Sequence, residues 1–266
     1  MSAAVWDPAH YLTYADERGR PFVELLTRVR AESPVDVVDL GCGPGNLTAL
    51  LAQRWPAARV RGLDASPEMI AAAHASSSAA PQDVEYEVAD LRAWLTRGEE
   101  VDVLVSNATL QWVPDHLDLL PDLVARVRPG GWIAVQVPGN FEEPSHTLRD
   151  EIAARAPYAG FTRDIAVPDA HDARTYAEAL ASLGCEVDAW ETTYLHVLHG
   201  PDPVFAWVSG TGARPTLAAL PGGVREAYEA EFKAALREAY PEGPAGVLLP
   251  FRRVFVVARV CEAGSR

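Results

Sequence analysis

Short apolar runs alternate with segments of helical periodicity through the first half of the chain. The runs predict strands over residues 37–40, 59–63, 84–88, 101–105 and 132–137. Between them apolar residues recur at helical spacing, as at Leu47, Leu50 and Leu51, and Ser66 is a good N-cap for the helix after the second strand. This alternation predicts strand–helix–strand crossovers, and hence an α/β fold with a mostly parallel sheet.

The second half of the chain has a less regular pattern. Residues 138–171 are rich in Pro, Glu and His and are expected to form a loop, after which Asp172 caps a predicted helix. Long apolar strands are expected over 186–198 and 253–260. They flank a helical segment, 201–246, in which Val224, Tyr228, Phe232 and Leu236 recur at a spacing of four. The expected organisation is an N-terminal lid and helix (1–34), a sheet core (35–200 and 247–266) and a helical insertion over the substrate site (201–246).

The turn after the first strand contains three alternating glycines, Gly41, Gly43 and Gly45. A strand, a glycine turn and a helix let the backbone approach a nucleotide-like ligand, although such glycines also serve packing alone. Asn46 stands where the dinucleotide fingerprint requires glycine. Asp39 ends the strand; its charge repels a pyrophosphate but suits a ligand with an ammonium group. The pattern therefore favours S-adenosylmethionine as the cofactor.

Polar residues at the ends of the next strands extend this cofactor site. Asp64 is placed to accept hydrogen bonds from two ribose hydroxyls, although an acid also suits a helix start. Met69 is expected to pack either on the adenine or in the core. Asp90 and the backbone N–H that follows it are expected to meet the adenine edge. Asn107 is expected either to lie at the carboxyl edge of the sheet, where ligands bind, or to form a turn. The predicted cofactor-binding residues are Asp39, Gly41, Cys42, Gly43, Asn46, Asp64, Ala65, Met69, Asp90, Leu91 and Asn107.

Composition excludes several classes of protein and partner. A net charge of −14 over 266 residues argues against nucleic-acid binding. Three dispersed cysteines suggest neither a disulfide framework nor a zinc site, and fit a reducing cytoplasm. No signal peptide and no apolar run near the ~20 residues of a membrane span is present. We expect a cytoplasmic protein, monomeric or weakly homo-oligomeric, without a metal.

These features together resemble the class I S-adenosylmethionine-dependent methyltransferases. Asp39–Gly45 matches their first motif, and Asp64, Asp90 and Arg128–Gly131 fall at later markers. The resemblance implies a Rossmann-like, seven-stranded, mostly parallel sheet with one antiparallel strand. A closer resemblance, to the trans-aconitate methyltransferases, covers nearly the whole chain. It rests on four segments: Trp6–Leu12, Gln53–Arg59, Asn107–His116 and Trp207–Pro215.

The closer resemblance implies methyl-ester formation on a carboxylate of a small polycarboxylic acid such as trans-aconitate. A carboxylate is already ionised at neutral pH, so no general base is needed and no catalytic residue is nominated. An acidic protein needs local basic groups to bind a polyanion. The substrate candidates are Tyr11, Arg18, Gln111, Trp112, Tyr194, His196, Trp207 and Arg214. For the arginines a solvated surface position, and for the aromatic residues a place in the core, is the alternative.

Three other functions stay open. The same cofactor could serve a hydroxyl or amine acceptor on a different metabolite. A nicotinamide oxidoreductase is disfavoured by Asn46 and Asp39. A non-catalytic cofactor-binding module finds no support in a sequence with intact glycines and Asp64.

Overall fold

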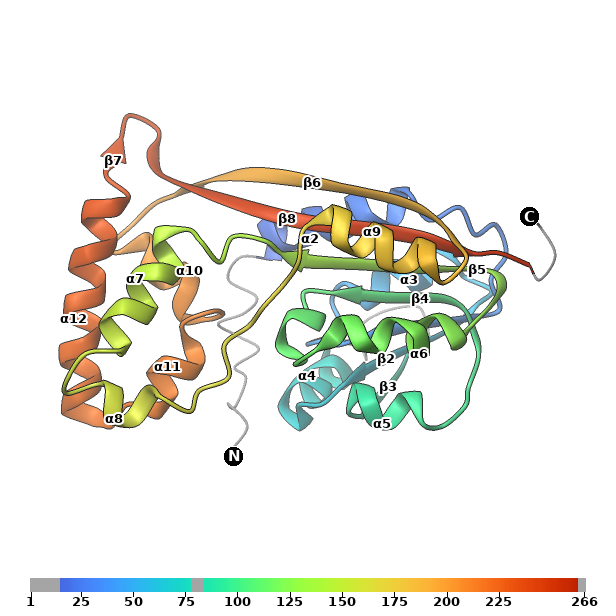
Figure 1. The fold of residues 1–266 in the computed structure, drawn as a ribbon, viewed down its shortest axis with the longest axis horizontal. Coiled ribbons are helices and arrows are strands. Elements are labelled where there is room, and N and C mark those ends of the chain that lie inside the picture. Colours follow the sequence, from blue (N-terminus) through green and yellow to red (C-terminus); the bar gives the residue numbers. More distant parts are fainter. Residues whose placement is uncertain (1–14, 78–83, 263–266) are drawn as a thin grey trace. The chain divides into compact units, whose positions relative to one another are not determined.

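The computed structural model describes residues 15–77 and 84–262, and its framework is one mixed β-sheet (Figure 1). Along the sheet the strand order is β3-β2-β1-β4-β5-β8-β6, and a short strand, β7, pairs antiparallel with β8. The pairs β1–β2, β1–β4, β2–β3 and β4–β5 are parallel. The strands are β1 (Asp36–Leu40), β2 (Arg59–Asp64), β3 (Val84–Val88), β4 (Val101–Asn107), β5 (Val127–Pro138), β6 (Cys185–Leu198), β7 (Glu242–Gly243) and β8 (Gly246–Val260).

The predicted α/β fold with a Rossmann-like, mostly parallel sheet is confirmed. β7 is the one strand of the described chain that the pattern of apolar runs does not predict, because it holds only two residues. β5 also begins earlier than expected, at Val127, because the strand includes an irregular segment, Arg128–Gly131, between the pairs Val101–Val127 and Val103–Trp132.

Helices follow most of the strands. They are α2 (Ala15–Thr27), α3 (Thr48–Arg54), α4 (Pro67–Ser77), α5 (Leu91–Leu95), α6 (Leu120–Ala125), α7 (Pro144–Ala153), α8 (Ala159–Thr162), α9 (Ala173–Ser182), α10 (Pro203–Ser209), α11 (Arg214–Ala219) and α12 (Gly222–Ala239), with 3₁₀ helices η1 (Leu110–Trp112) and η2 (His116–Leu119). The expected caps form: Asp172 accepts from Thr175 N at 2.8 Å and Ser66 Oγ from Met69 N at 3.3 Å. Across the described residues, every helix is too short or too polar to cross a membrane.

The chain divides into two compact units. The sheet unit contains the described residues up to Val137, then Ala170–Glu191 and the residues from Val254 onward. Its core is built on the central strands, where Val37, Val38 and Leu104 are fully buried. Arg128 of β5 binds both Asp102 of β4 and Asp36 of β1 at 2.9 Å and so ties these strands together.

The second unit, here called the helical unit, contains Pro138–Asp169 and Thr192–Arg253. Its helices α7, α8, α10, α11 and α12 form one group in Figure 1. The predicted spacing on α12 is confirmed, since Tyr228, Phe232 and Leu236 are buried. The expected loop over 138–171 is wrong: α7 and α8 form there, and α7 packs against α12. The pattern is obscured because the buried face of α7 includes polar residues, Ser145, His146 and Arg149.

Candidate active site

The glycine turn joins the carboxyl end of β1 to α3. Gly41, Gly43 and Gly45 all have positive φ, at 77°, 56° and 78°. Residues with a Cβ rarely adopt this conformation, so the backbone path depends on these glycines. The backbone N–H groups of Gly41 and Cys42 donate to Leu63 O on β2 at 2.7 and 3.0 Å. The turn is therefore fixed against the end of the neighbouring strand.

Asp64, the last residue of β2, holds the turn and the next helix together. Its Oδ2 accepts from Gly43 N at 2.9 Å and its Oδ1 from Ser66 N at 2.8 Å. Burial raises the pKa of this carboxyl, while the two backbone hydrogen bonds oppose the rise. Each oxygen keeps a further lone pair, as recognition of a ribose diol requires.

A cavity of about 270 Å³ opens beside this turn, where the carboxyl ends of β1, β2 and β4 meet. Eight predicted cofactor residues line it: Gly41, Gly43, Asp64, Ala65, Met69, Asp90, Leu91 and Asn107. The other three, Asp39, Cys42 and Asn46, line a small cavity of about 20 Å³ that shares Gly41, Gly43 and Asn107 with the first. The structure thus gathers every predicted cofactor residue around one turn.

Two of these residues have a structural role as well. Asp90 accepts from Ala93 N at 3.1 Å and caps α5, so its carboxylate is partly committed to the helix. Met69 is 4% exposed and belongs to the core while it lines the cavity. The core position that the sequence left open for Met69, and the capping role of Asp90, are therefore compatible with a place in the cavity wall.

Asp39 is more deeply buried than its position at a strand end suggests. It is 2% exposed and accepts from Thr48 Oγ1 at 2.7 Å. Burial raises its pKa to about 7, the Thr48 hydrogen bond opposes the rise and the charge of Asp64 adds to it. Without a bound cation this carboxyl holds its proton up to near-neutral pH.

A pH dependence of stability follows from this shift. Between about pH 4 and 7 the folded chain keeps the Asp39 proton that the unfolded chain has lost. The free energy of unfolding of the cofactor-free protein therefore falls as pH rises through this window. In Asp39→Asn the decrease is expected to be smaller, although Asp64 retains part of it. Urea unfolding at pH 5 and 7.5 measures both slopes; equal slopes in the two proteins would contradict the assignment.

Two buried side-chain oxygens near the cavity have no hydrogen-bond partner among the described residues: Asn107 Oδ1 and Gln111 Oε1. The amide nitrogen of Gln111 donates to Ala108 O at 2.7 Å, which fixes the side chain on η1. Buried acceptors normally have a donor, so these oxygens fit a ligand that carries N–H or O–H groups. For Asn107 Oδ1, an ammonium group between it and Asp39 would meet this requirement.

The predicted substrate residues fall into separate groups. Trp112 lines the cofactor cavity, next to Gln111. In the helical unit the His196 ring lies 4.5 Å from that of Trp207 and 6.3 Å from that of Tyr194, between centroids, in a buried cluster. Arg214 begins α11. Tyr11 and the side chain of Arg18 lie outside the described part of the chain.

Sequence reasoning missed a polar group in the helical unit, formed by Asn140, Ser145, His146 and Arg149, all at most 7% exposed. The sequence signal that could have indicated the helix carrying this group is Pro144, because proline is common in the first turn of a helix and Pro144 begins α7. His116, by contrast, bonds Tyr176 Oη at 2.6 Å in the core of the sheet unit and has a structural role. No group of three or more His, Cys, Asp or Glu in the described chain could hold a metal ion.

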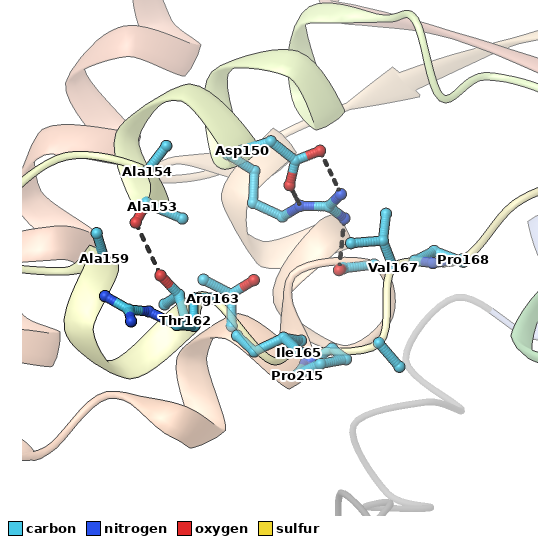
Figure 2. Close-up of a pocket in the computed structure, with 14 residues that line it drawn as sticks. Asp150, Ala153, Ala154, Ala159, Thr162, Arg163, Ile165, Val167, Pro168 and Pro215 are labelled. Atoms are coloured by element: carbon cyan, nitrogen blue, oxygen red, sulfur yellow. Dashed lines mark hydrogen bonds and ion pairs between the residues drawn. The ribbon is translucent and has the colours of Figure 1, made fainter.

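The helical unit also contains a cavity of about 360 Å³ (Figure 2). Its wall is mainly apolar, and Figure 2 shows Asp150 on one side with Ile165 and Pro215 on the other. Asp150 forms a two-point ion pair with Arg149, at 2.7 and 2.8 Å. The cavity contains none of the residues predicted to bind cofactor or substrate, although it borders Gly212 and Thr216, on either side of Arg214.

Comparison with known proteins adds independent findings. Residues 37–131 match a family model described as a methyltransferase domain. The trans-aconitate 2-methyltransferase of Streptomyces avermitilis is 52% identical, over 97% of this chain and 98% of that protein. That of Mycolicibacterium gilvum is 49% identical, over 96% and 99%.

Solved structures show the same fold at low sequence identity. A methyltransferase in complex with the Haloferax volcanii Trm112 activator has a TM-score of 0.58 at 19% identity, covering 97% of this chain and 96% of that one. Haemonchus contortus phosphoethanolamine N-methyltransferase 2, solved with S-adenosyl-L-methionine, has a TM-score of 0.51 at 15% identity, covering 90% and 52%.

Proposed function

Because this chain belongs to the trans-aconitate 2-methyltransferase family of S-adenosylmethionine-dependent enzymes, we propose that it forms a methyl ester on a carboxylate of a small polycarboxylic acid, with trans-aconitate as the first candidate. The observation that carries this proposal is the turn held by Asp64, around which all eleven predicted cofactor residues lie. The second candidate function keeps the cofactor and changes the acceptor to a hydroxyl or amine of another metabolite.

The residues present fit the cofactor. Asp64 would accept from the ribose hydroxyls, and Asp90 with the N–H of Leu91 would meet the adenine edge beside Met69. The ammonium of the methionine part would lie near Asn107 Oδ1 and Asp39, whose proton it would displace. When bound, the cofactor supplies an electrophilic methyl group on a sulfonium.

The acceptor needs orientation rather than deprotonation. A carboxylate oxygen of the acceptor would take up the methyl group that the bound cofactor supplies, and the electron pair of the carbon–sulfur bond would stay on sulfur. The reference pKa of a carboxyl is about 4, so the nucleophile is ionised at neutral pH without a base. The chain's contribution is therefore alignment of the two reactants and binding of the acceptor's remaining charges.

Arg214→Ala is expected to raise the KM for the acid about tenfold, because a carboxylate loses a charge-assisted hydrogen bond. Arg214 begins α11, and Gly212, two residues earlier, is packed closely against the His146 ring. Cofactor affinity should stay within about twofold. Steady-state kinetics and calorimetry measure the two quantities; an unchanged KM removes Arg214 from the acceptor site.

Product analysis tests the proposal directly. The purified protein is incubated with S-adenosylmethionine and a panel of polycarboxylic acids, phenols and amines, and products are identified by mass spectrometry. A mass gain of one methyl group on an acid, reversed by mild alkaline ester hydrolysis, is the expected result. Methylation confined to phenols or amines favours the second candidate function. An absence of S-adenosylmethionine binding rejects both.

A cytoplasmic location and a small-molecule partner complete the proposal. Cys42 and Cys185 are free and buried, which suits a reducing compartment. The net charge of −14 supports a partner other than nucleic acid.

A further inference from the structure

The start of α7 contains polar side chains with unused hydrogen-bonding capacity. Asn140 Oδ1 and Ser145 Oγ are buried, and neither has a partner among the residues that the structure describes. The backbone of this segment is tightly closed: Glu143 N donates to Asn140 O at 3.1 Å and His146 N donates to Glu143 O at 2.8 Å. The side chains therefore belong to one rigid turn, which follows β5 by two residues.

His146 in the same turn has a defined tautomer. Its Nδ1 lies 3.2 Å from Nη1 of Arg149. A guanidinium has only donors, so Nδ1 must accept and the ring proton is on Nε2. The pKa of His146 is lowered to about 4, mainly by burial and next by the positive charge of Arg149. The negative charge of Asp150 opposes this decrease. The ring is therefore a neutral donor through Nε2 at neutral pH, where a carboxylate is ionised.

Several contacts fix Arg149 and, through it, the ring. Asp150 holds Nε and Nη2, while Nη1 donates to Gly212 O at 2.7 Å. Tyr228 Oη of α12 donates to the carbonyl of Arg149 at 2.9 Å. A Cβ on Gly212 would lie 2.9 Å from Cε1 of His146, so the ring is packed against this turn as well. Phe141 also contacts the His146 ring edge-on, with centroids 5.2 Å apart.

We propose that the Nε2–H of His146, together with the hydroxyl of Ser145, binds a carboxylate of the acceptor through neutral hydrogen bonds. This inference rests on the proposed function, since it assigns residues to the acid-binding part of that reaction. Neutral donors orient a carboxylate while withdrawing less charge from it than an arginine does, which leaves the oxygen a better nucleophile. Arg149 is then a positioning residue, because it acts through the ring of His146.

Two amide substitutions test the role of Nε2. His146→Gln places an amide near the position of Nε2, whereas His146→Asn reaches only the position of Nδ1 and retains an acceptor for Arg149. We expect His146→Asn to raise the KM for the acid about tenfold or more, with kcat and cofactor affinity within about threefold. His146→Gln is expected to stay within about threefold of the wild-type KM. A KM that is unchanged in His146→Asn, or raised equally in both variants, overturns the proposal.

The wild-type protein provides a second measurement if His146→Asn does not fold. In ¹⁵N-imidazole NMR, saturating acid should shift the signal of one buried neutral histidine protonated at Nε2. If no histidine signal of this kind moves while the acid binds, the inference is rejected. Failure of the proposed function looks different, since in that case the wild-type protein makes no methyl ester from any polycarboxylic acid.

Discussion

Gly41→Ala is expected to destabilise the folded protein by more than about 3 kcal/mol, whereas Gly43→Ala is expected to keep most of its stability and to lose cofactor binding. Both glycines have positive φ, which costs an alanine about 1–2 kcal/mol. At Gly41 the new Cβ would also lie 2.0 Å from Oγ1 and 2.6 Å from Cβ of Thr109. That overlap involves the rigid part of a β-branched side chain, so the backbone must move. The expected decrease in the free energy of unfolding, above about 3 kcal/mol in total, is a large share of the stability of a typical protein.

At Gly43 the same methyl group meets no atom within 4 Å. The residue lines both cavities of the cofactor site, so the methyl group occupies space that the ligand needs. The variant should unfold at a denaturant concentration only slightly below that of the wild type, while its S-adenosylmethionine affinity falls about 100-fold. Urea unfolding and calorimetry separate the two effects. Equal loss of stability in both variants would show that the Thr109 contact does not decide the outcome.

Asp64→Ala is the second variant for which we expect a large effect, a loss of about 100-fold in cofactor affinity. Two effects add. The ribose loses its acceptor, and the N–H groups of Gly43 and Ser66 lose the carboxylate that holds them at 2.9 and 2.8 Å. Each unsatisfied N–H costs roughly 1–3 kcal/mol if it stays buried, so the glycine turn should also become mobile.

Glu68→Ala is the matched control. Glu68 is an exposed acid in the first turn of α4, the helix that follows Asp64, and it lines neither cavity of the cofactor site. Its cofactor affinity should remain within about twofold of the wild type. Calorimetric titration with S-adenosylmethionine compares the three proteins. If Glu68→Ala weakens binding as much as Asp64→Ala does, general acidity at the helix start explains the effect and the specific role of Asp64 is wrong.

The parts of the site that could be predicted from the sequence are those fixed by local geometry. Parallel strands in register end at one edge of a sheet, so Gly41, Asp64 and Asn107 had to come together once the strands were identified. The protonated state of Asp39 could not be predicted in this way. It depends on burial, which arises only when α3 brings Thr48 against the strand.

The polar turn at α7 was missed for a related reason. Its residues are buried because α12, far away in sequence, covers them: Tyr240, just after this helix, accepts from Ser145 N at 3.0 Å, and Tyr228 binds Arg149. A local hydrophobic pattern contains no information about a partner 79 or 95 residues away. In the sequence, the polar residues on the inner face of α7 therefore give the pattern of a solvated loop.

The interleaving of the two units has a consequence for synthesis on the ribosome. The chain enters the helical unit at Pro138, leaves it after Asp169, re-enters at Thr192 and returns to the sheet unit at Val254. β8, made last, lies between β5 and β6. Neither unit can be completed while β8, which contributes to both, remains in the exit tunnel, and contacts between such distant segments slow folding. The nascent chain would therefore expose the edges of β5 and β6 that pair with β8 until β8 itself has left the ribosome.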